Sequence, residues 1–174
     1  MTHTVVQVPV REAETIVRSR ALASGSAYQP QDGSLMAHIT LLGPFMPEPL
    51  ADGVIADLER YFSDVTTFGY TLSGVSAFPG GPTYLVPDPA GVFRRLTLGL
   101  LHVFPEFPPY GGAFDDVVPH VSVPLLPDES TESLREDLER RLPIEAVAHT
   151  ATLVRVSEGD TRTLATFPFG TTAA

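Results

Sequence analysis

Two short segments of this 174-residue chain share one pattern, and together they constrain the fold more than any other feature. His38-Ile39-Thr40-Leu41 and His120-Val121-Ser122-Val123 both read histidine, aliphatic, hydroxyl, aliphatic. In a β-strand, alternate side chains point to the same face. Each segment therefore predicts a strand that buries its aliphatic side chains and presents one imidazole and one hydroxyl together on the other face.

Chance explains one such segment more easily than two. A histidine that is followed two residues later by a hydroxyl, with apolar residues between and after them, is expected roughly 0.15 times in a chain of this composition. Two accidental occurrences have a probability on the order of 1%. We therefore disfavour the interpretation that the two histidine–hydroxyl segments arose by chance.

The two segments also occupy matching places in an internal repeat. The order strand, helix, hairpin occurs twice, and residues 70–76 can be overlaid on residues 151–157 with an offset of 81. His38 and His120 are 82 residues apart. This agreement indicates an old duplication, in which we expect each half to contribute one sheet and one histidine to a shared cleft.

Hydropathy patterning predicts the individual elements. Strands are expected at 4–10, 35–42, 68–78, 83–86, 120–125, 144–157 and 161–167, and helices at 11–23, 49–62, 90–104 and 130–142. Ser130 is the expected N-cap of the last helix. Residues 105–119 form a long loop, and because structureless loops of ~15 residues are uncommon unless they serve a site, we expect this loop to cover the cleft.

The length fits one domain, since domains average ~150 residues. We predict a single α+β domain over residues 1–174, with two lobes in a pseudo-twofold arrangement, each an antiparallel sheet with flanking helices. The lobe halves span roughly residues 20–90 and 105–170, and the N-terminal strand completes the fold.

Charge and cysteine content exclude several classes of protein. All 11 basic residues are Arg, against 21 Asp and Glu, which gives a formal net charge of −10. A protein that coats long DNA or RNA needs basic side chains for the phosphates, so this class is disfavoured, whereas a small phosphorylated ligand is not. The absence of Cys excludes disulfides, thiolate nucleophiles and Cys-based metal sites.

Neither a leader nor a membrane span is evident in the sequence. The first ten residues lack a basic region followed by an apolar core, and no apolar run reaches the ~18 residues that a span requires. We expect a cytoplasmic monomer that does not associate with membranes.

The double motif resembles a known family. The segments at residues 38–45 and 119–123 are similar to the two signatures of the 2H phosphoesterases, the superfamily of 2′-5′ RNA ligase-like proteins and cyclic nucleotide phosphodiesterases, and residues 108–112 resemble its inter-motif loop. The resemblance spans roughly residues 4 to 168. It implies a two-lobed fold, no cofactor or metal, and a phosphodiester bound between the lobes. Ser122 departs from the commoner Thr of the second signature.

The chemistry of such a site can be argued from the side chains. Imidazole accepts and donates protons near neutral pH, which suits His38 and His120 as catalytic base and acid in either order. The hydroxyls of Thr40 and Ser122 can bind the phosphate and donate to its non-bridging oxygens. Tyr110 and Phe114 are candidates for stacking on a nucleobase, although packing of the loop onto the body of the protein is at least as good an explanation for both.

Other chemistry-bearing residues favour ordinary positions. His3, His102 and His149 have no hydroxyl residue two positions later, and Arg94 and Arg95 fit the solvated face of a helix. Asp115-Asp116 lacks the partners that a metal site needs. The Gly80-Gly81 and Gly111-Gly112 pairs match no phosphate-binding loop.

These observations predict a metal-independent phosphodiesterase for a small nucleotide or an RNA end with a 2′,3′-cyclic or 2′-5′ linkage. Two alternatives stay open at this point. One is 2′-5′ RNA ligation, and the other is a nucleotide-binding module that has the same cleft but no turnover.

Overall fold

The computed structural model describes residues 2–112 and 117–170 of the chain. In chain order the elements are β1 (His3–Pro9), the 3₁₀ turn η1 (Arg11–Ala13), α1 (Glu14–Ala23), β2 (His38–Leu42), α2 (Val54–Ser63), β3 (Phe68–Ala77), β4 (Thr83–Asp88), α3 (Ala90–Val103), the 3₁₀ turn η2 (Pro109–Gly112), β5 (Val121–Val123), α4 (Thr131–Glu139), β6 (Ile144–Ala148), β7 (Thr150–Val156) and β8 (Arg162–Pro168).

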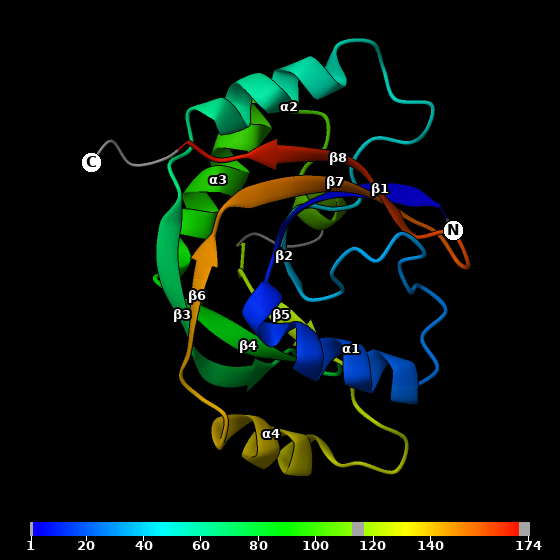
Figure 1. Cartoon of the computed structure of the whole chain (residues 1–174), viewed down its shortest axis with the longest axis vertical. Coiled ribbons are helices and arrows are strands. Elements are labelled where there is room, and N and C mark those ends of the chain that lie inside the picture. Colours follow the sequence, from blue (N-terminus) through cyan, green and yellow to red (C-terminus); the bar gives the residue numbers. More distant parts are fainter. Residues whose placement is uncertain (1, 113–116, 171–174) are drawn as a thin grey trace.

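The strands of the described residues form two antiparallel sheets of four. One sheet has the order β2-β1-β7-β8 and the other has the order β5-β4-β3-β6. Helix α2 packs against β8, α4 packs against β3 and β4, and these two helices lie at opposite ends of the molecule (Figure 1). The α+β class and the arrangement of two antiparallel sheets with flanking helices are confirmed.

The two sheets repeat one plan. The motif strands β2 and β5 are outermost, β1 and β4 come next, and β7 and β3 follow. Helices α1 and α3, which follow β1 and β4 in the chain, pack against the motif strand of the opposite sheet: α1 contacts β5 and α3 contacts β2. The pseudo-twofold relation therefore includes the helices as well as the strands.

The prediction that each half forms its own sheet is wrong. The sheet that contains β2, from the first half, is completed by β7 and β8 from the second half. The other sheet combines β3 and β4 from the first half with β5 and β6 from the second. Sequence patterning identifies strands but not their partners, because pairing depends on contacts between residues far apart in the chain.

Residues 144–157, predicted as one strand, are two strands that belong to different sheets. β6 pairs with β3, and β7 pairs with β1 and β8. The chain passes from one sheet to the other at the exposed residue His149. The apolar residues give no signal for this crossing, because short apolar runs look alike in either sheet.

Helix α2 begins at Val54, five residues after the predicted start. Its N-cap is Gly53, which has φ 84°. A residue with a left-handed backbone cannot continue a right-handed helix, so Gly53 separates the turn before it from the helix after it. Ser130 caps α4 as predicted, since its side chain accepts a hydrogen bond from the backbone N–H of Ser133.

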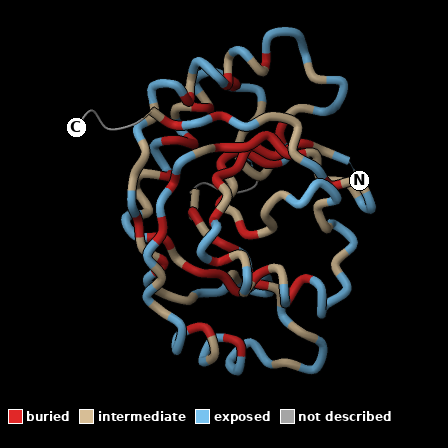
Figure 2. Tube along the Cα trace, in the orientation of Figure 1, coloured by how far each residue is buried: buried red, intermediate tan, exposed pale blue. Residues whose placement is uncertain are grey.

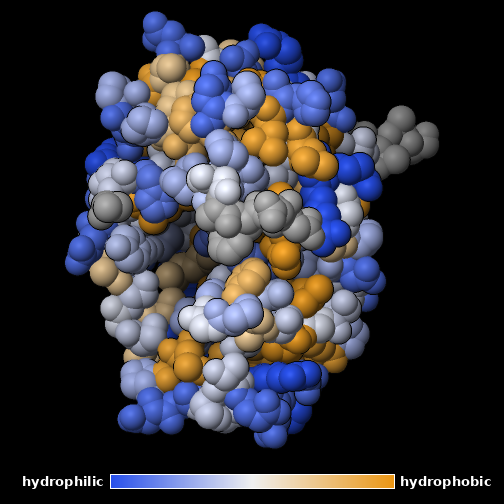
Figure 3. Space-filling view, turned by 180° about the vertical axis from the view of Figure 1, so that it is seen from behind, coloured by the Kyte–Doolittle hydropathy of each residue, from blue (hydrophilic) through white to orange (hydrophobic). Residues whose placement is uncertain are grey.

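One continuous apolar core joins both sheets. The buried stretches of the chain follow the strands and one side of each helix (Figure 2). Seen from behind, the surface is hollowed near its middle, with apolar side chains above and below the hollow (Figure 3). Among the described residues, no helix combines the length and apolarity needed to cross a membrane.

Candidate active site

The strands that carry the two motifs face each other. β2 and β5 are each the outermost strand of a sheet, and they contact one another. His38 is the first residue of β2, and His120 directly precedes β5. The fold therefore brings the two repeated segments, 82 residues apart in the sequence, to a common seam between the sheets.

Within each motif, the side chains alternate as the sequence predicts. Ile39, Leu41, Val121 and Val123 are all buried in the core. The two histidines and the two hydroxyl residues, Thr40 and Ser122, are half-buried or exposed. In each motif the aliphatic side chains pack in the core, and the imidazole and the hydroxyl lie on the opposite face of the strand.

Both imidazoles are oriented by the same kind of hydrogen bond. His38 Nδ1 lies 2.7 Å from the carbonyl oxygen of Met36, and His120 Nδ1 lies 2.7 Å from that of Val118. A carbonyl only accepts, so Nδ1 carries the proton in each ring. Within the described part of the chain, Nε2 of either ring has no hydrogen-bond partner, and this nitrogen can accept a proton in the neutral form.

Burial lowers the pKa of both imidazoles. The carbonyls of Met36 and Val118 oppose this effect, because they stabilise the protonated rings. The charge of His120 lowers the pKa of His38 further, and the carboxylate of Glu14 raises it. Screening confines such an influence to short range, so His120 lies near enough to His38 to disfavour its protonated form.

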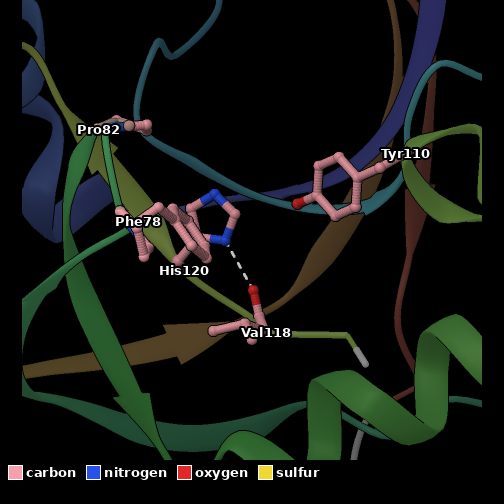
Figure 4. A pocket seen from close by; sticks show the side chains of 7 residues that line it. Phe78, Pro82, Tyr110, Val118 and His120 are labelled. Atoms are coloured by element: carbon pink, nitrogen blue, oxygen red, sulfur yellow. Dashed lines mark hydrogen bonds between the residues drawn. The ribbon is translucent and has the colours of Figure 1, made fainter. Parts of the chain in front are cut away.

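Three cavities that share lining residues surround the two motif segments. A cavity of about 520 Å³ beside His120 is lined by Phe78, Pro79, Gly81, Pro82, Tyr110, Val118 and His120 (Figure 4). Gly81 and Pro82 also line a cavity of about 250 Å³ that includes Ser122. Ser122 in turn lines a cavity of about 210 Å³ that includes His38. Each histidine thus lines one of these cavities, and Ser122 borders two of them.

Tyr110 lies across the large cavity from His120. The two ring centroids are 6.4 Å apart with an interplanar angle of 21°, and the hydroxyl of Tyr110 points toward the side on which His120 lies (Figure 4). Its backbone has φ 53°, a left-handed conformation that is uncommon for a residue with a side chain, and its N–H donates to the Gly43 carbonyl at 2.8 Å. This bond ties the predicted loop to the end of β2.

The other residues that the sequence analysis considered for the site are not among the described residues that line the three cavities. Thr40 lies on β2 on the same face as His38, close to Gly43, where an added Cβ would be 3.2 Å from the Thr40 methyl group. Phe114 and the Asp115-Asp116 pair lie outside the described residues. In the described part of the chain, no group of three or more His, Asp or Glu side chains is arranged to hold a metal ion.

Sequence reasoning missed the aromatic residues around His120. The rings of Phe78 and Tyr84 lie with centroids 5.0 and 5.2 Å from that of His120. Both come from the β3–β4 hairpin, which the sequence predicts correctly. No local signal could show that this hairpin pairs with β5, so its aromatic residues could not be assigned to the site.

Sequence reasoning also missed the side chains that hold the segments leading into the motifs. The Glu14 carboxylate accepts hydrogen bonds from the backbone N–H groups of Met36 and Ala37, each at 2.9 Å. Arg18, which pairs with Glu14, donates to the Ser34 carbonyl at 2.6 Å. Arg94, expected on a solvated helix face, donates to the Val117 carbonyl at 2.9 Å. Helices α1 and α3 thereby hold the segments that lead to His38 and His120.

Comparison with known proteins identifies the family. A sequence model of the 2′-5′ RNA ligase superfamily matches residues 6–160, which is most of the chain. The chain belongs to this superfamily. The resemblance that the two motifs indicate is thus confirmed, and the superfamily is one of phosphoesterases and ligases. A search of curated proteins gave no match.

Solved structures of the same fold cover nearly the whole chain. TT0787 of Thermus thermophilus is 18% identical, with 97% of this chain and 98% of that chain covered and a TM-score of 0.65. E. coli LigT complexed with NADP+ is 17% identical, with 97% of both chains covered and a TM-score of 0.60. LigT complexed with 3′-AMP is 16% identical, with 97% and 98% covered and a TM-score of 0.56. At these identities the likeness establishes the fold.

Proposed function

We propose that this superfamily member is a metal-independent phosphodiesterase that hydrolyses 2′,3′-cyclic or 2′-5′-linked phosphodiesters of small nucleotides or RNA ends. The observation that carries the proposal is the pair of imidazoles on facing edge strands. Both are fixed through Nδ1 by a carbonyl at 2.7 Å, and both leave Nε2 for chemistry. The complex of LigT with 3′-AMP supports a small nucleotide as the ligand class.

Hydrolysis needs two proton transfers, and each imidazole can carry out one of them. Nε2 of the neutral imidazole takes a proton from water as its oxygen attacks phosphorus, and the protonated imidazole gives a proton to the ribose oxygen that leaves. The bond to that oxygen breaks as the bond to water forms, so one proton is taken up and one released. Mutual repulsion of the two charges favours the state in which only one imidazole is protonated, which is the competent state.

The other side chains supply binding and charge stabilisation. The hydroxyls of Thr40 and Ser122 donate to the non-bridging oxygens, where negative charge accumulates in the transition state. The aromatic and proline side chains of the 520 Å³ cavity form an apolar surface for a nucleobase, with Tyr110 as the stacking residue. Phe114, on the same loop, is the second candidate for stacking.

The test measures product formation from 2′,3′-cyclic AMP and from 2′-5′-linked ApA. We expect release of a nucleoside monophosphate, unchanged by EDTA. His38→Ala and His120→Ala should each lower kcat by about 10²–10⁴, because each removes one acid or base. His102→Ala is the matched control, since His102 is exposed and its Nδ1 also contacts a backbone carbonyl, that of Leu98 at 2.9 Å.

Three outcomes would contradict the proposal. Retained turnover in the His38→Ala, His120→Ala double variant would exclude the two-histidine mechanism. Saturable binding of 3′-AMP without any product would indicate a binding module. Joining of RNA ends to a 2′-5′ linkage with no hydrolysis would indicate a ligase.

A further inference from the structure

Gln7 is a buried polar residue that neither motif explains. It lies in the middle of β1, between Val6 and Val8, and is only 4% exposed, whereas the two valines are fully buried. Among the described residues, its side-chain amide has no hydrogen-bond partner. The fully buried side-chain atoms without a hydrogen-bond partner in the described part of the chain belong to Tyr70, Thr152 and Arg155, so the amide atoms of Gln7 are not fully enclosed. Gln7 lines a cavity, where its amide is available to hydrogen-bond a ligand from outside the chain.

The register of the sheet places Gln7 beside the candidate site. Gln7 is opposite Thr40 of β2 on one side and opposite Thr152 of β7 on the other. Side chains directly opposite each other in an antiparallel pair share a face, so Gln7 is on the face that carries His38 and Thr40. Gln7 also lines the 210 Å³ cavity together with His38 and Ser122.

A second unsatisfied group lies next to Gln7. The hydroxyl oxygen of Thr152 is buried and has no hydrogen-bond partner. A hydroxyl can donate to the carbonyl oxygen of an amide, and this bond would leave the NH₂ group of Gln7 as the donor that faces the cavity. The two unsatisfied groups thus complement each other once a ligand engages the amide.

We propose that Gln7 is a substrate-binding residue whose NH₂ group donates to a non-bridging oxygen of the phosphodiester, with Thr152 as the positioning residue for its amide. The inference rests on the proposed function, because it requires a phosphoryl group between His38 and Ser122. The chain has no Lys, and no Arg is among the described residues that line the three cavities. The phosphodiester is therefore bound by uncharged hydrogen-bond donors, namely the amide of Gln7 and the hydroxyls of Thr40 and Ser122.

The experiment measures kcat/KM for 2′,3′-cyclic AMP and the Kd of 3′-AMP by calorimetry. Gln7→Met retains the length of the side chain but has no N–H, and we expect it to lower kcat/KM by about 10²-fold, as for loss of one oxyanion donor. Gln7→Glu should lower it at least as much at neutral pH, because a carboxylate repels the phosphate. This loss should shrink as the pH falls, since a protonated carboxyl can donate.

Two further variants separate binding from packing. Gln31→Glu is the matched control for charge, because Gln31 is exposed, and it should leave kcat/KM unchanged. Thr152→Val removes one oxygen and preserves the shape of the side chain. We expect it to lower kcat/KM less than Gln7→Met does, and to have no additional effect in the Gln7→Met background, as expected of residues that act as a unit.

The outcomes distinguish this inference from the proposed function. Gln7 variants with kcat/KM and 3′-AMP affinity within two-fold of a folded wild type overturn the inference and leave the function standing. A wild type that binds 3′-AMP but turns over no substrate overturns the function, and the affinities of the variants then decide the inference. If the Gln7 variants do not fold, Thr152→Val with unaltered kinetics overturns it. A wild type with neither binding nor turnover overturns both.

Discussion

At the level of single residues, we expect the protonation of the two imidazoles to be coupled. Both rings are partly buried, which lowers the pKa of each, and the charge of His120 lowers the pKa of His38 further. The apparent pKa values in a rate profile therefore belong to the pair rather than to either ring.

This coupling predicts the pH dependence of catalysis. Below both pKa values the base is protonated, and above both the acid is lost, so kcat/KM follows a bell-shaped curve. Because both pKa values are lowered from ~6.5, we expect the maximum below about pH 6.5. A bound phosphodiester carries negative charge that favours the protonated imidazoles, so the kcat profile should be displaced to higher pH. Steady-state kinetics with 2′,3′-cyclic AMP checks both curves, and a kcat/KM maximum above pH ~8 would contradict the assignment.

At the scale of elements, helices α1 and α3 set the positions of the catalytic segments. Glu14 of α1 binds two consecutive backbone N–H groups, and one of them belongs to Met36, whose carbonyl orients His38. Arg94 of α3 binds the carbonyl of Val117, next to the residue that orients His120. Glu14 meets backbone donors and Arg94 meets a backbone acceptor, so side chains of opposite charge hold the two segments.

Glu14→Gln tests the contribution of α1. The variant loses the charge and one acceptor oxygen, so we expect kcat/KM to fall by about ten-fold through misplacement of His38. Loss of the carboxylate also removes an influence that raises the pKa of His38, so the limb of the pH profile that reports His38 should move to lower pH. Glu12→Gln, at an exposed residue of the neighbouring turn, is the control for the change of charge. An unaltered kcat/KM in Glu14→Gln would exclude the positioning effect, and a pH profile with both limbs unaltered would exclude the electrostatic one.

Ser130→Ala tests the capping of α4. The Ser130 hydroxyl accepts from the Ser133 N–H at 3.1 Å, and its loss should lower the free energy of unfolding by about 1 kcal/mol. Urea denaturation measures this difference. Ser133→Ala, a change of the same chemistry within the helix, should lower the stability little or not at all, because alanine favours a helix interior. Equal effects of the two substitutions would show that the cap is not the cause.

At the scale of the whole molecule, the exchange of strands makes the halves interdependent. Each sheet combines strands from both halves, and aromatic contacts cross between them: Phe62 of α2 stacks on Phe167 and Phe169, with centroids 5.5 and 5.7 Å apart. The duplicated halves are therefore not separate folding units.

Fragments 1–104 and 105–174 test this interdependence. Each fragment would expose sheet edges and apolar surface that the other covers, so we expect neither to fold alone. Circular dichroism during thermal or urea denaturation would show this as the absence of a cooperative transition, with the full chain as the control. A cooperative transition in either isolated fragment would contradict the prediction.

Features that depend on neighbouring residues could be predicted from the sequence. The alternation in the two motifs predicted which side chains enter the core, and hydropathy predicted most helices and strands, including the N-cap at Ser130. These features depend on residues within a few positions of each other, so the local sequence is enough to predict them. The family follows from the same local segments, because its signatures are short.

The pairing of the strands and the surroundings of each imidazole became known from the three-dimensional fold. The exchange of strands, the break at His149 and the contact of β2 with β5 all arise from residues far apart in the chain. The same holds for Phe78 beside His120, for Glu14 beneath the segment before His38, and for Gln7 opposite Thr40 and Thr152. Local patterning carries no information about such pairings, because they are selected by the packing of the complete core.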